Sequence, residues 1–105
     1  MLSELCAAFS RLAPTGKAMF FARVAHNSTV DARGAYAKDH ANPDGAMLRE
    51  YNEFVHRVSG YTMHVRDGSE MDGQDDSVMK MIFEFYGAGN KTRQKQLADW
   101  LQIAE

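Results

Sequence analysis

The segment 47–65 constrains the fold most, because its apolar and polar residues recur with the period of an α-helix. At about 100° per residue, one half of the helical wheel collects Met47, Leu48, Tyr51, Phe54, Val55, Val58, Tyr61, Thr62 and Val65. The other half carries Arg49, Glu50, Glu53, His56, Arg57, Gly60 and His64. Such a helix buries one side against other elements and leaves the other in water. The pattern predicts a helix over about 44–66 with a core beside it.

The rest of the chain is predicted to form further helices separated by turn-forming residues. Apolar spacing and breakers together predict helices at about 2–13, 16–36, 44–66, 78–86 and 91–104. Ser3 and Thr15 are the expected N-caps of the first two, and Asp75, Asp76 or Ser77 that of the fourth. Pro14 is expected to end the first helix.

Segment 78–86 could also be a strand, since Met79, Met81, Phe83 and Phe85 alternate. Lys80 and Glu84 stand four residues apart, which favours a helix, and a lone strand would have no partner. As a helix the segment is apolar nearly all round and must be buried on most sides. A homodimer could supply part of that cover.

Length and composition are those of one globular domain. The chain has 105 residues, of which 45% are hydrophobic, enough for a core without disulfides or metal. We therefore predict an all-α, compact single-domain bundle of four to five helices spanning residues 1–105.

Cys6 is the sole cysteine, so no disulfide can form within the chain. It falls on the apolar face of the first helix and is expected to be buried. No apolar stretch is long enough to span a membrane, and no signal segment opens the chain. These features predict a reducing, cytoplasmic location.

The net charge of −2 argues against nucleic-acid binding. Recognition of single-stranded RNA also needs exposed aromatic rings near arginine. The rings of Tyr51, Phe54 and Tyr61 instead fall on the apolar half of the 47–65 wheel. We expect a protein partner rather than a nucleic acid.

Residues 53–56, Glu-Phe-Val-His, resemble half of the Glu-x-x-His signature of ferritin-like di-iron bundles. That family has a second such motif and two further glutamates, which this chain lacks. His56 and His64 are eight residues apart, too far along a helix for one ion, so His26 or His40 would have to complete a site. We predict no metal site and no cofactor.

No nucleophile elbow, phosphate-binding loop or calcium loop is present. The sequence therefore leans against catalysis. One enzymatic alternative stays open, an acid–base or metal site centred on His56 with Glu53 orienting it.

The leading functional hypothesis is a protein-interaction or regulatory module. The expected helices at 16–36 and 44–66 carry polar faces rich in Arg and His. Arginine side chains suit carboxylate or phosphate groups. Gly60 sits within a helix, where glycine costs about 1 kcal/mol relative to alanine, as though a partner approached there. The predicted partner-binding residues are Arg23, His26, Arg33, Arg49, Glu53, His56, Arg57, Gly60 and His64.

Overall fold

The computed structural model describes residues 1–39, 45–67 and 74–105, without the side chains of 32, 33, 35–39, 46 and 47. Its elements are α1 (Leu2–Ser10), α2 (Pro14–Asp39), α3 (Ala46–Arg66), α4 (Asp75–Ile82), a π-helical turn η1 (Phe83–Gly87) and α5 (Lys91–Ile103). No strand occurs in these ranges. The all-α bundle predicted from the sequence is confirmed.

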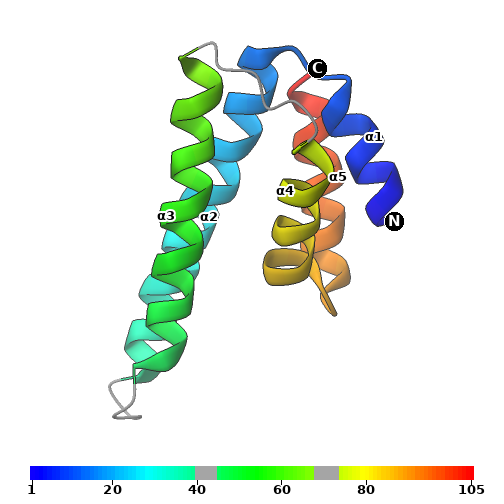
Figure 1. Ribbon diagram of the computed structural model, residues 1–105. Helices are drawn as coiled ribbons and strands as arrows, with labels where there is room; N and C mark the ends of the chain where they lie inside the picture. The colour runs from blue at the N-terminus through cyan, green and yellow to red at the C-terminus, as the bar shows by residue number, and fades with distance from the viewer. Residues whose placement is uncertain (40–44, 68–73) are drawn as a thin grey trace.

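The long helices α2 and α3 form an antiparallel hairpin (Figure 1). The shorter α1, α4 and α5 pack together beside one end of it, and the other end extends past them. The molecule is accordingly elongated, with extents of 43 × 29 × 21 Å. Within the described ranges, every helix is too short or too polar to cross a lipid bilayer.

Aromatic rings join the short helices to the hairpin. The Phe9 ring of α1 lies 5.8 Å from that of Phe20 and 5.1 Å from that of Phe21, both on α2. Phe21 in turn lies 6.1 Å from Tyr61 of α3. Phe9, Phe20 and Phe21 are fully buried, as is Val24 one turn along α2. The buried face of α2 is therefore the centre of the core.

Two ion pairs also fasten α2 to the short helices. Lys17 Nζ lies 2.9 Å from Asp75 Oδ2 at the start of α4. Arg93 Nη2 of α5 lies 2.5 Å from Asp31 Oδ2. Each pair joins residues about 60 positions apart in the chain, so each is a tertiary contact that no local sequence pattern reveals.

The first two helix boundaries differ from the prediction. Helix α1 ends at Ser10, and α2 begins at Pro14, with Thr15 inside it. Proline suits the first helical position, because an amide hydrogen there would have no partner in the helix. Ser3 is likewise inside α1, whose N-cap is Met1. Neither expected cap, Ser3 nor Thr15, is correct.

The fourth helix is confirmed as helix, although its caps were wrong. Asp75, Asp76 and Ser77 all lie within its first turn, and the N-cap Gln74 makes no side-chain cap bond. The two carboxylates still suit the positive end of the helix dipole. The core buries Val78, Met79 and Ile82, so the fold itself covers most of this apolar helix.

Gly16 allows α2 to lie close to the end of α5. A Cβ atom built on Gly16 would lie 2.5 Å from the backbone oxygen of Ala104, closer than packed atoms can approach. Near it, Leu97 and Leu101 of α5 and the C-cap residue Ala104 are buried, and Trp100 is half-buried.

Candidate functional site

The apolar and polar halves of α3 lie where the sequence places them. Phe54, Val58 and Val65 are buried, whereas Tyr51 and Tyr61 are half-buried. On the other half the exposed residues are Arg49, Glu50, Glu53, His56, Arg57, Gly60 and His64. We call these seven residues the ionic line of α3. Met63 interrupts the polar half and is 67% exposed.

The other predicted residues belong to α2, the second helix of the hairpin. Arg23 and His26 are exposed, and the side chain of Arg33 lies outside the described residues. Among the described residues, ion pairs join Lys17 to Asp75, Lys80 to Glu84, Arg93 to Asp31 and Lys95 to Asp99. None of these pairs includes an arginine of the predicted binding set.

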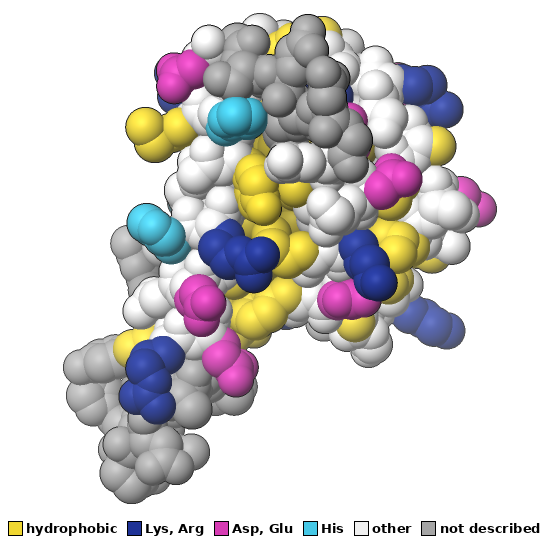
Figure 2. All heavy atoms as spheres, in the orientation of Figure 1, with side chains coloured by type: hydrophobic (Ala, Val, Ile, Leu, Met, Phe, Trp, Pro, Cys, Tyr) yellow, Lys and Arg dark blue, Asp and Glu magenta, His cyan; other side chains and the backbone are white. Residues whose placement is uncertain are grey.

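A band of hydrophobic side chains is open to solvent between α3 and α4 (Figure 2). Tyr51 and Tyr61 of α3, Met81 of α4 and Phe85 of η1 are half-buried. We call the surface formed by these four residues the furrow. Charged and histidine side chains over α3 border one side of the hydrophobic band (Figure 2), and Lys80 and Glu84 lie beside Met81 and Phe85 on the other. Beside α4 the surface is hollowed by about 370 Å³, lined by Ser77, Lys80, Met81, Glu84 and Phe85.

The π-helical turn places the Phe85 ring at the bottom of the furrow. The Phe85 ring stacks on that of Phe54, with centroids 4.4 Å apart and an interplanar angle of 20°. It meets Tyr51 edge-on at 5.4 Å. π-Helical turns are rare and often mark functional sites. The sequence predicted an α-helix through residue 86, and apolar periodicity alone does not distinguish the two forms.

Arg93 stands at a polar junction that sequence reasoning missed. Besides its pair with Asp31, its Nη1 donates to the backbone oxygen of Tyr86 at 3.3 Å. Its guanidinium carbon lies 4.8 Å from the centre of the Tyr86 ring, and the Tyr86 hydroxyl donates to Gln96 Oε1 at 3.1 Å. The junction joins α2, η1 and α5, and its groups are occupied with one another.

The environment of the junction shifts two pKa values upward. Burial raises the pKa of the Tyr86 phenol, and the negative charge of Asp31 adds to the effect. Burial alone would lower the pKa of Arg93, but a hydrogen bond with Tyr51 and the charge of Asp31 outweigh it and raise the pKa. Both groups therefore hold their protons firmly, which suits a structural role.

Cys6 is half-buried rather than buried. It lines a surface hollow of about 640 Å³ between α1 and α4, together with Ser3 and Asp76. Burial, then the charge of Asp76 and a hydrogen bond with it, raise the pKa of the Cys6 thiol. Since the thiolate is the nucleophilic form, this environment disfavours reaction at Cys6.

The histidines were the candidates for a metal or acid–base site. His26, His56 and His64 are exposed, and His40 lies outside the described residues. Among the residues described, no three His, Cys, Asp or Glu side chains stand close enough to hold one metal ion. Glu53 and His56 share the outer side of α3, and neither lines the hollows at Arg66, Cys6 or Met81.

No family model, curated protein or solved structure matches the chain. Besides the Cys6 hollow, two surfaces of the described structure combine charged with apolar side chains. One is the furrow with the ionic line beside it, and the other is a hollow between α2 and α3.

Proposed function

We propose that this protein is a helical interaction module that binds a helix of a partner protein in the furrow. The observation that carries the proposal is an apolar strip left half-exposed between two charged helix faces (Figure 2). Protein interfaces commonly have this anatomy, with apolar and aromatic groups at the centre and charged groups at the rim. The proposal takes its rim residues from the ionic line of α3.

The rim charges define the chemistry of the partner. The ionic line offers arginines and glutamates together, α4 adds Lys80, and η1 adds Glu84. A helix whose apolar stripe is flanked by charges of both signs complements such a rim, in the common helix-in-groove manner. Arg23, His26 and Arg33 of α2 stay predicted contacts of the same partner. We also propose a cytoplasmic location, on the argument from the lone cysteine.

Gly60 supports the proposal. A Cβ atom built there would meet nothing within 4 Å, and the residue is exposed. No described neighbour within the protein therefore requires glycine, although alanine would stabilise the helix by about 1 kcal/mol. Close approach of a partner helix would account for the missing side chain.

The test begins by identifying the partner through a photo-crosslinking residue placed at position 60. A second protein carries the same residue at Lys91, on the exposed start of α5, as the matched control. The partner captured only from position 60 is purified, and its affinity is measured by calorimetry. We expect the double variant Arg49→Glu/Arg57→Glu to weaken binding about tenfold or more, and Gly60→Trp to do the same.

The control variant Lys91→Glu/Lys95→Glu changes as many charges on α5 and should leave the affinity unchanged. Circular dichroism checks that all variants keep their helical content. Equal affinity of wild type and the α3 variants would refute the proposal. Capture of a second copy of this chain at position 60 would also refute it, in favour of the homodimer considered from the sequence.

A further inference from the structure

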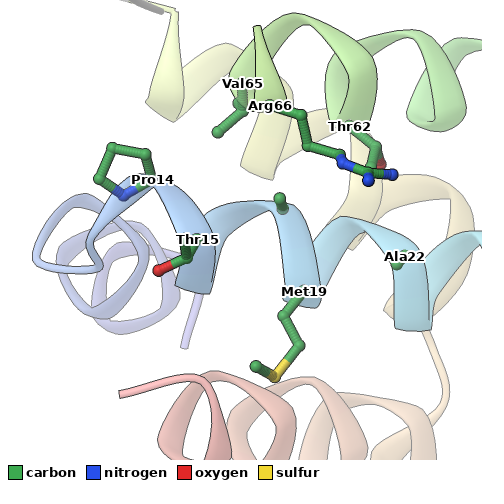
Figure 3. A pocket seen from close by; sticks show the side chains of 8 residues that line it. Pro14, Thr15, Met19, Ala22, Thr62, Val65 and Arg66 are labelled. Carbon is green, nitrogen blue, oxygen red and sulfur yellow. The ribbon is translucent and has the colours of Figure 1, made fainter. Parts of the chain in front are cut away.

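A second hollow, of about 530 Å³, lies in the seam between α2 and α3 (Figure 3). It is lined by Pro14, Thr15, Ala18, Met19, Ala22, Thr62, Val65 and Arg66. Its volume falls within the range of small-molecule sites, about 300–1,000 Å³. None of the residues of the ionic line or of the furrow contributes to its lining.

The lining combines an apolar surface with a single positive charge. Ala18, Ala22 and Val65 supply small apolar groups, and Met19 is 45% exposed. Arg66 extends from the end of α3 back along that helix, so that its guanidinium lies beside Thr62 (Figure 3). No acidic side chain lines the hollow, and Arg66 takes part in none of the ion pairs among the described residues.

The polar groups around the hollow favour an anion. The Thr62 hydroxyl donates to the backbone oxygen of Val58 at 3.2 Å, and Arg66 is the one charged side chain of the described lining. Arg23 and His26 are exposed one turn further along α2, four residues after Met19 and Ala22. The positive charge of Arg23 adds to the attraction for a negative ligand at this seam.

We propose that this hollow binds a small amphipathic carboxylate, with the apolar chain against Ala18, Ala22 and Val65 and the carboxylate on Arg66. A planar guanidinium pairs with a carboxylate through two parallel hydrogen bonds. The apolar chain removes alanine, valine and methionine surface from water. The flexible side chain of Met19 adapts to the shape of that chain.

The test is an NMR titration of the whole protein with octanoate, following the backbone amides and the methionine and alanine methyl groups. We expect saturable shifts centred on Ala18, Met19, Ala22 and Thr62. Octylammonium, which has the same chain and the opposite charge, should give no saturable shift there. Arg66→Gln should raise the dissociation constant about fivefold or more.

Two further variants locate the effect. Ala22→Leu places a larger side chain at the hollow and should also weaken octanoate binding; Ala22 is exposed, so the fold tolerates it. Arg57→Gln removes an arginine of the ionic line and should change nothing. Binding that is unaffected by Arg66→Gln, equal binding of octylammonium, or shifts that never saturate would each overturn the proposal.

Discussion

Replacing Phe9 with alanine is expected to lower the free energy of unfolding by about 3–5 kcal/mol. The Phe9 ring is fully buried and touches the rings of Phe20 and Phe21. Its removal takes away the ring contacts of α1 with α2 and leaves a cavity that the neighbouring rings fill only in part. A domain of this size has about 5–15 kcal/mol of stability in all, so the variant loses a large share of it.

Urea unfolding followed by circular dichroism measures the effect of Phe9→Ala. The control is Ile103→Ala on α5, where the side chain is 58% exposed and the change should stay within about 0.5 kcal/mol. A loss for Phe9→Ala no larger than that of the control would mean that α1 does not pack on the hairpin as described.

Replacing Arg93 with methionine is expected to cost about 2 kcal/mol of stability. Methionine keeps an apolar chain against the Tyr86 ring but removes the charge. The Asp31 carboxylate, whose side chain is 29% exposed, then loses its ion-pair partner, and the backbone oxygen of Tyr86 loses a donor. Hydrogen bonds to charged groups contribute about 1.5–3 kcal/mol, and partial exposure keeps the loss below the upper end.

The matched control for Arg93→Met is Lys95→Met in the same helix. Lys95 pairs with Asp99, but the two side chains are 78% and 51% exposed, so this pair should contribute less than about 0.5 kcal/mol. Both variants are compared by urea unfolding, together with Asp31→Asn and the double variant Arg93→Met/Asp31→Asn. Equal losses of stability for Arg93→Met and Lys95→Met would contradict the stabilising role of the ion pair between Arg93 and Asp31. Strictly additive losses in the double variant would contradict it as well.

The sequence predicts α3 well because one helix face repeats over many turns. Periodicity alone separates Phe54, Val58 and Val65 from His56 and Arg57, and packing does not need to be known. The cap predictions failed because caps depend on single residues. Ser and Asp also occur in first turns, where Ser77 donates to the backbone oxygen of Gln74 at 3.0 Å and Asp75 pairs with Lys17.

The surfaces between helices could not be predicted from one sequence. The furrow exists because α3 meets η1 through Phe54 and Phe85 while Met81 and Tyr61 stay half-covered. That outcome depends on how helices distant in sequence cross. The junction of Asp31 and Arg93 also joins residues 62 positions apart. To predict the hollow at Arg66, one would have to know which residues of α2 lie opposite the end of α3.

The most direct test of the account is solvent accessibility along α3, measured by NMR with a soluble paramagnetic gadolinium chelate. The account predicts strong relaxation of the His56 ring protons and the Met63 methyl group, intermediate relaxation of the Met81 methyl group in the furrow, and almost none of the Val58 methyl groups. Strong relaxation at Val58, or a protected His56 ring, would contradict the exposed ionic line on which the proposed binding surface depends.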